Sequence, residues 1–256
     1  WFGTPNPVPP PSVWTYDFAP LPFPSQIATT FAQIPQACAA ADCSAFVQST
    51  VREAGPLLSP AGYPVDFMST LAEAAVAGAT IGLATSNNLE NFSQALADVV
   101  GAASNGTADG LADAGVPADQ ATAITVQAVA SSARSAMVSV AAEPNLPVEL
   151  KSQVVSQMVE KAVEVLGTVA PGAPAASINA AVGEIATAVV EAASTAGISV
   201  AAAPEIVTAL QSVSALSTDS AQQTAIVQVA TALASGTPVA EVLASLPAEL
   251  PAASPS

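Results

Sequence analysis

The most regular hydrophobic pattern in the chain lies between residues 148 and 166. Apolar side chains recur there every three or four positions, which places them on one face of an α-helix. They are Leu150, Val154, Val155, Met158, Val159, Ala162 and Val165. Glu160 and Glu164 flank Lys161 on the opposite, polar side, and Gly167 follows as a residue that commonly ends helices. The pattern predicts an amphipathic helix that ends near Leu166.

Similar helical segments, separated by Pro, Gly and capping residues, follow one another after residue 42. The predicted helices cover 43–53, 66–85, 87–105, 108–114, 117–142, 148–166, 177–196, 204–216 and 218–235, with a short last helix from Pro238. We therefore predict an all-α fold, a multi-helix bundle of about eight Ala- and Val-rich helices over residues 37–246, with a possible sub-boundary near 168–176. Residues 247–256 are expected to form a disordered tail.

The first 36 residues have a different composition, with nine of the 22 prolines and seven of the eleven aromatic residues. Proline at this density disfavours helix and favours an extended or polyproline II path, so residues 1–36 are predicted to form an extended arm. Large aromatic side chains on such an arm contact water unless the arm docks, either on the protein's own helices or on a partner. The candidate partner-binding residues are Trp1, Phe2, Trp14, Tyr16, Phe18 and Phe23.

The net charge of the chain excludes some classes of binding partner. Twenty Asp and Glu residues outnumber four Lys and Arg residues, which gives a net charge of −16 at pH 7. Such a surface repels the phosphates of nucleic acids and the anionic headgroups of lipid bilayers, so nucleic-acid binding is excluded. The longest uncharged run, residues 220–240, contains three Gln, one Gly and one Pro, and no direct membrane span is predicted.

The chain contains no histidine, which removes the usual general base and the commonest metal ligand. Lys151 and Lys161 lie beside Glu residues on the amphipathic helix and are interpreted as solvated charges. The densest set of oxygen ligands, considered as a calcium site, is explained better as acids near helix N-termini. This set is Asn105, Asp109, Asp113 and Asp119. We therefore predict no catalytic residue, no metal site and no cofactor.

Cys38 and Cys43, the only two cysteines, lie five residues apart. On one continuous helix their side chains would point about 140° apart, so a disulfide requires Cys38 to lie in a turn before the helix. A structural disulfide in an oxidising compartment is the preferred interpretation, and a reactive pair or two buried thiols are the alternatives. The chain does not start with Met, and Trp1 resembles an end left by processing, so we expect export to an extracellular, periplasmic or organelle-lumen location.

Together these features favour a non-enzymatic structural or linker subunit that docks onto a larger assembly through its N-terminal arm. The assembly is either a membrane protein complex, with this chain as an extrinsic subunit, or an extracellular polymer. The expected partners are accordingly other protein subunits or copies of the same chain. The alternative hypothesis is a helical carrier that holds a small apolar ligand, such as a lipid or pigment, between its helices.

Overall fold

The computed structural model describes residues 25–40, 43–86, 91–199, 203–237 and 241–242. These residues form nine α-helices and no β-strand, which confirms the predicted all-α fold. The helices are α1 (Ser25–Ala40), α2 (Cys43–Leu58), α3 (Phe67–Thr85), α4 (Phe92–Asp113), α5 (Ala118–Ala142), α6 (Val148–Val169), α7 (Ala175–Ala196), α8 (Pro204–Ser214) and α9 (Ser220–Ala234). Short 3₁₀ turns, Ser59–Ala61 and Ala170–Gly172, follow α2 and α6.

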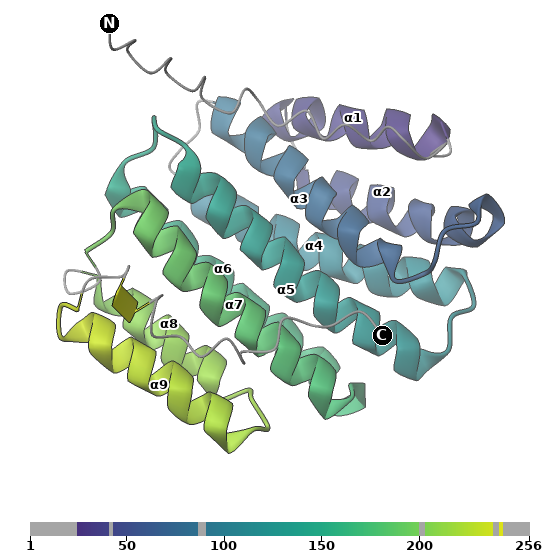
Figure 1. Cartoon of the computed structure of the whole chain (residues 1–256). Helices are drawn as coiled ribbons and strands as arrows, with labels where there is room; N and C mark the ends of the chain where they lie inside the picture. The colour runs from purple at the N-terminus through teal and green to yellow at the C-terminus, as the bar shows by residue number, and fades with distance from the viewer. Residues whose placement is uncertain (1–24, 41–42, 87–90, 200–202, 238–240, 243–256) are drawn as a thin grey trace, which may run out of the picture.

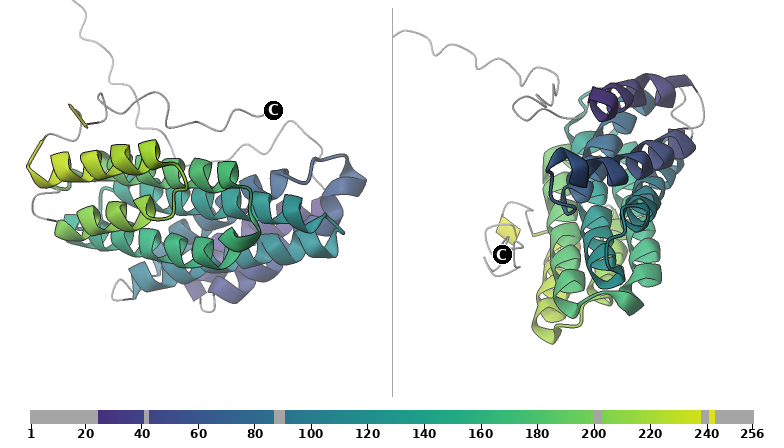
Figure 2. Two further views of the ribbon diagram at one scale, coloured as in Figure 1. Left: turned by 90° about the horizontal axis from the view of Figure 1, so that it is seen from below. Right: turned by 90° about the vertical axis from the view of Figure 1, so that its right-hand side faces the viewer.

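Alternate helices form two layers (Figures 1 and 2). Helices α1, α3, α5 and α7 pack side by side in one layer, and α2, α4, α6 and α8 do so in the other. Consecutive helices are joined by short connections and form antiparallel hairpins, so each hairpin packs mainly against the hairpins before and after it. This is the organisation of an α-solenoid, in which a broad face of one layer is available for binding.

Glycines allow the first hairpin to approach the second very closely. Gly106 and Gly110 lie one turn apart on α4, where α2 crosses it. A Cβ atom on Gly106 would come within 2.6 Å of the Gln48 carbonyl oxygen, and one on Gly110 within 2.8 Å of the Arg52 carbonyl oxygen. On α3, Gly82 faces α1 in the same way, with Cys38 Cβ 2.7 Å from the position a Cβ would take. Helices built from small side chains gain their contacts by this close backbone approach.

The predicted extended arm over residues 1–36 is wrong for residues 25–36. These residues belong to helix α1, although Pro35 lies among them. A proline inside a helix removes one hydrogen bond and is tolerated only where packing offsets the loss. Here Ile27, Phe31, Ile34 and Cys38 follow one another at helical spacing and are all buried. The helical body therefore begins at Ser25, and only residues 1–24 of the predicted arm lie outside the described residues.

Three further helix ends differ from the sequence prediction. Helix α4 continues through Asn105 and Gly106 to Asp113, so the two predicted segments are one helix. Helix α2 extends past Gly55 to Leu58, and α6 passes Gly167 and ends at Val169. Gly55 and Gly106 lie where α2 and α4 pack closely, and Gly167 lies inside α6. The predicted helix from Pro238 and the tail at 247–256 lie outside the described residues, apart from residues 241–242.

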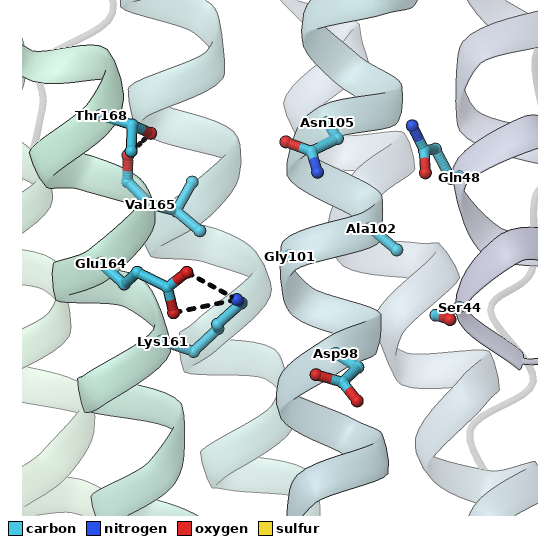
Figure 3. A pocket seen from close by; sticks show the side chains of 10 residues that line it. All are labelled: Ser44, Gln48, Asp98, Gly101, Ala102, Asn105, Lys161, Glu164, Val165 and Thr168. Atoms are coloured by element: carbon cyan, nitrogen blue, oxygen red, sulfur yellow. Dashed lines mark hydrogen bonds and ion pairs between the residues drawn. The ribbon is translucent and has the colours of Figure 1, made fainter.

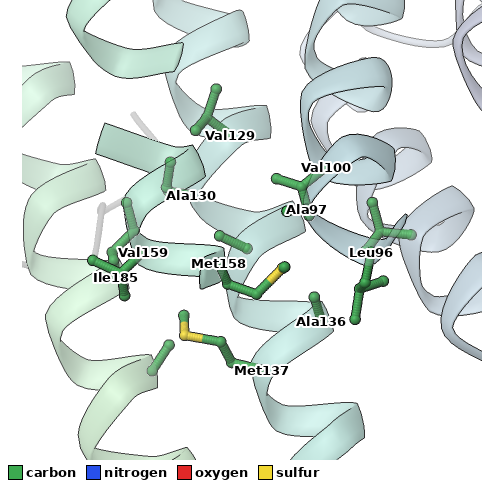
Figure 4. Packing of buried hydrophobic residues seen from close by; sticks show 14 of the residues in the cluster. Leu96, Ala97, Val100, Val129, Ala130, Ala136, Met137, Met158, Val159 and Ile185 are labelled. Atoms are coloured by element: carbon green, nitrogen blue, oxygen red, sulfur yellow. The ribbon is translucent and has the colours of Figure 1, made fainter. Parts of the chain in front are cut away.

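One hydrophobic cluster runs from Ile27 to Val242 and crosses residues 168–176 without a break. Where the two layers meet, the flexible side chains of Met137 on α5 and Met158 on α6 fill the space among Ala and Val residues (Figure 4). Phe92 is the largest side chain with less than 2% of its surface exposed, and it is the one aromatic residue in that set. The core of the described part therefore depends on many small contacts and few large ones.

The two outer helices of the stack, α1 and α9, expose mainly small and polar side chains, and Val227 on α9 is exposed among them. The outer side of α1 exposes Gln26, Thr29, Gln33 and Gln36. At the other end, α9 packs on α8, and its start is fixed by hydrogen bonds. The Asp219 carboxylate accepts from the backbone N–H of Ala221, and Asn179 on α7 accepts from the backbone N–H of Thr218 at 2.8 Å. Terminal units of this kind close the hydrophobic core of a helical stack against solvent.

Candidate functional site

A groove crosses the layer formed by α2, α4 and α6 and has a volume of about 400 Å³ (Figure 3). Its floor is the outer face of α4, where Gly101 and Ala102 carry no large side chain. Ser44 and Gln48 on α2 form one wall, and α6 forms the other. The lining residues are Ser44, Gln48, Asp98, Gly101, Ala102, Asn105, Lys161, Glu164, Val165 and Thr168. The site is therefore assembled from three helices that are far apart in the sequence.

Lys161 is held in place along the α6 wall. Its Nζ atom donates to both carboxylate oxygens of Glu164, at 3.1 and 3.0 Å. Its aliphatic part crosses α4 at Gly101, where a Cβ atom would lie 2.7 Å from Lys161 Cε. Glycine at position 101 thus makes room for the lysine, and the ammonium and carboxylate groups neutralise each other.

The remaining polar groups of the groove are one carboxylate, two amides and two hydroxyls. Asp98 accepts a hydrogen bond from Gln94 at 2.9 Å and takes part in no ion pair among the described residues. Gln48 donates through Nε2 to Asp109, at 3.3 Å, which leaves its Oε1 atom as an acceptor. The Thr168 hydroxyl donates to the Val165 carbonyl oxygen. This arrangement can form hydrogen bonds and ion pairs with a polar ligand, and its lysine is committed to Glu164.

All four cations of the chain are engaged within the fold. Arg52 pairs with Asp113 at 2.7 Å, Arg134 with Glu191 at 3.4 Å, and Lys161 with Glu164. Hydrogen bonding to Asp113 raises the pKa of Arg52. The prediction that Lys151 is a solvated charge is wrong. Lys151 is buried, with 7% exposed, and its Nζ atom donates to the Ala141 carbonyl oxygen at 3.0 Å. It thereby satisfies a carbonyl in the last turn of α5, where a positive charge is favourable.

A second group of charges lies on the other layer, across α3, α5 and α7. Burial raises the pKa of Glu73 on α3 and of Glu184 on α7, and the nearby Arg134 partly opposes both shifts. Glu73 also raises the pKa of Glu184 by repulsion. Arg134 itself is paired with Glu191. Ionisation of these two half-buried carboxyl groups therefore costs more free energy in the folded protein than it does in water.

Replacing Glu184 by glutamine is expected to raise the free energy of unfolding at pH 7. A carboxyl with a raised folded pKa binds its proton more tightly in the folded state. The stability that this provides is complete below the unfolded pKa of about 4.5 and is lost as pH rises through the folded pKa. The gain from Glu184→Gln should therefore be present at pH 7 and vanish below pH 4, as measured by urea unfolding. The exposed Glu160→Gln is the control, and an equal gain in both variants would contradict the assignment to burial.

Cys38 and Cys43 form a disulfide, and both residues are buried. Cys38 lies in the last turn of α1 and Cys43 is the first residue of α2, so the bond joins two helices. The expected turn before the helix is thus replaced by a break between two helices. The bond ties α1 to the rest of the first hairpin.

The other residues singled out in the sequence are dispersed. Trp1, Phe2, Trp14, Tyr16, Phe18 and Phe23 lie outside the described residues. Asp109 and Asp113 on α4 are engaged by Gln48 and Arg52, and Asp119 lies on α5. Within the described ranges, no group of three or more Cys, Asp or Glu side chains is arranged to hold a metal ion.

Among the described helices, two are long and apolar enough to span a membrane by length and composition, whereas the sequence predicted no span. They are α3 (Phe67–Thr85) and α7 (Ala175–Ala196). More than half of each is buried inside the fold, where α3 packs against α1 and α5, and α7 against α5. Core helices of water-soluble proteins have the same length and composition, so this is weak evidence for a membrane span.

Compared with models of protein families, with curated proteins and with solved structures, the chain has no significant match.

Proposed function

We propose that this protein is a non-enzymatic helical scaffold that docks onto a larger assembly through its N-terminal arm. The observation that supports this proposal most is how completely the helical body covers its own core. In the described part of the chain, three large apolar side chains are exposed: Ile81, Val148 and Val227. They lie on three different helices, α3, α6 and α9. The described helical body therefore offers little apolar surface for the six aromatic residues in the first 24 positions to contact. This favours docking of these residues on the surface of a partner.

The ends of the stack support an attached subunit over a polymer of this chain. Assembly into a polymer requires complementary surfaces on successive copies, and helical stacks extend most readily through apolar ends. The described residues at both ends expose mainly small and polar side chains, apart from Val227 on α9, and a net charge of −16 makes copies repel one another at neutral pH. The proposed role is therefore that of an extrinsic subunit.

The chemistry of the groove supports binding rather than catalysis or apolar-ligand transport. Its hydroxyl, amide and charged groups suit a polar contact and give an apolar lipid or pigment no matching surface. Its lysine is held by Glu164, and no histidine exists in the chain to activate a nucleophile. The function that these features favour is recognition of another protein.

Deletion of residues 1–24 tests the role of the arm. The truncated protein is expected to keep its helical circular dichroism and its unfolding midpoint, because the described residues from Ile27 to Val242 form one continuous hydrophobic core. Native mass spectrometry of gently purified material should then show the full chain with partner subunits and the truncated chain alone. Deletion of residues 247–256 is the matched control and should leave the complex intact. A truncated chain that still purifies with the same partners would refute docking through the arm.

A further inference from the structure

The groove on the even-numbered layer has one face of α4 as its floor. Asp98, Gly101, Ala102 and Asn105 are spaced by three, four and seven residues from the first, so they share one side of the helix. Seven residues of α-helix span about 10 Å, which separates the carboxylate of Asp98 from the amide of Asn105 along the floor. Figure 3 shows Gln48 facing this strip from α2 and Lys161 from α6. A volume of about 400 Å³ is within the range of ligand sites.

The charge inside the groove is unbalanced by one unit. Lys161 and Glu164 neutralise each other through two hydrogen bonds of 3.0–3.1 Å. Asp98 is exposed, is contacted by the neutral Gln94, and lies within ion-pair distance of no cation in the described residues. The chain has no spare cation to supply, because Arg52, Arg134 and Lys161 are paired and Lys151 is buried beneath α5. A cation that pairs with Asp98 would therefore come from another molecule.

The groups around Asp98 favour a guanidinium over a simple ammonium. The strip offers acceptor oxygens from the Asp98 carboxylate, the Asn105 amide and Gln48 Oε1, which its own bond to Asp109 leaves available. A guanidinium presents five donors in one plane and can pair both oxygens of a carboxylate at once, which favours it over an ammonium at Asp98. The acceptors farther along the strip suit the backbone N–H groups of the peptide that carries the arginine. The α6 wall carries no net charge, because Glu164 neutralises Lys161, so Asp98 is the group in the groove that attracts a cation.

We propose that this groove binds an arginine side chain of the partner protein, with the guanidinium on Asp98 and the peptide that carries it extending along the floor toward Asn105 and Gln48. The inference rests on the proposed docking function and adds a second contact to it, on the body of the protein. The arm contributes aromatic surface, and the groove contributes a charged contact that fixes which way the body faces.

The test is an NMR titration of the full, ¹⁵N-labelled chain with the peptide acetyl-Gly-Ser-Arg-Ser-Gly-amide. Saturable shifts of the side-chain amide signals of Asn105 and Gln48 are expected, and they should weaken as salt is added. Asp98→Asn should weaken binding about fivefold, the size expected of an exposed ion pair. Asp119→Asn makes the same change on an exposed acid of α5 and should bind as the unaltered chain does. Asp98 is itself exposed, so its replacement leaves folding intact.

Two further peptides identify the group that is recognised. The citrulline peptide keeps the shape of arginine without its charge and should cause no saturable shift, and the lysine peptide should bind more weakly than the arginine peptide. Equal weakening by Asp98→Asn and Asp119→Asn, or shifts that avoid Asn105 and Gln48, would refute the site. Peptide binding to the groove with no loss of the complex on deletion of residues 1–24 would refute arm docking alone. An arm-dependent complex with no peptide binding would refute the groove alone.

Discussion

Alanine at position 55 is expected to lower the free energy of unfolding by about 2–3 kcal/mol. The new Cβ atom would lie 2.7 Å from Gly110 Cα and closer still to the Gly110 carbonyl group. The atoms it meets are backbone atoms of α4, which cannot rotate away as a side chain can, so α2 and α4 must separate. The higher helix propensity of alanine recovers at most about 1 kcal/mol. Urea unfolding followed by circular dichroism measures the change.

Two other glycines provide matched controls for this substitution. A Cβ atom on Gly101 would also fall 2.7 Å from a neighbour, but that neighbour is Cε of Lys161, which can move aside. Gly101→Ala should therefore change stability little while it displaces Lys161 from Glu164. Gly167 has nothing within 4 Å of its Cβ position and lies inside α6, so Gly167→Ala should stabilise by up to about 1 kcal/mol. The close-approach explanation fails if all three variants have the same stability.

Truncation of Phe92 to alanine is expected to cost about 3–5 kcal/mol. Its ring is 1% exposed at the start of α4, and the surrounding core consists mainly of Ala, Val and Leu. Small, tightly packed neighbours have few rotamers with which to fill the vacated space, so the cavity persists. Thermal and urea unfolding should both report the loss.

Two substitutions separate the cavity from the loss of an aromatic ring. Phe92→Leu retains most of the volume and should cost less than about 1.5 kcal/mol. Phe46 is only partly buried on the side of α2, so Phe46→Ala should cost clearly less than Phe92→Ala. A loss below 1 kcal/mol for Phe92→Ala, measured beside a fully folded control, would show that the described core does not depend on this side chain.

The helix pattern was largely readable from the sequence, and the exceptions have specific causes. Pro35 suggested an extended path, yet Ile27, Phe31, Ile34 and Cys38 carry a helical spacing that outweighs one lost hydrogen bond. Likewise, Asn105-Gly106 suggested a helix end. Gly106 instead lies in mid-helix because α2 passes over it, and a sequence does not reveal which helix will cross another.

The groove could not have been predicted in the same way. Its walls come from positions as far apart as Ser44 and Thr168, and only the order in which helices pack brings them together. Lys151 shows the same limit. It lies beside Glu149 on an amphipathic helix and so resembles a surface charge, but the α5–α6 connection places it under the carbonyl group of Ala141. By contrast, composition alone shows that no histidine is available in the chain as a general base or a metal ligand.

The disulfide at the C-terminal end of α1 affects how a pulling force on the N-terminus is passed to the other helices. A protein held to its partner by residues 1–24 receives any tension at Ser25, the first residue of α1. Helix α1 is held to α2 by the Cys38–Cys43 bond and to α3 by the close contact at Gly82. Both attachments lie at the C-terminal end of α1, so a pull that reaches them passes to two helices, one in each layer, and α1 stays joined to α2. If the proposed arm docking holds, the arm can bear tension while the proposed binding face of α2, α4 and α6 keeps its shape.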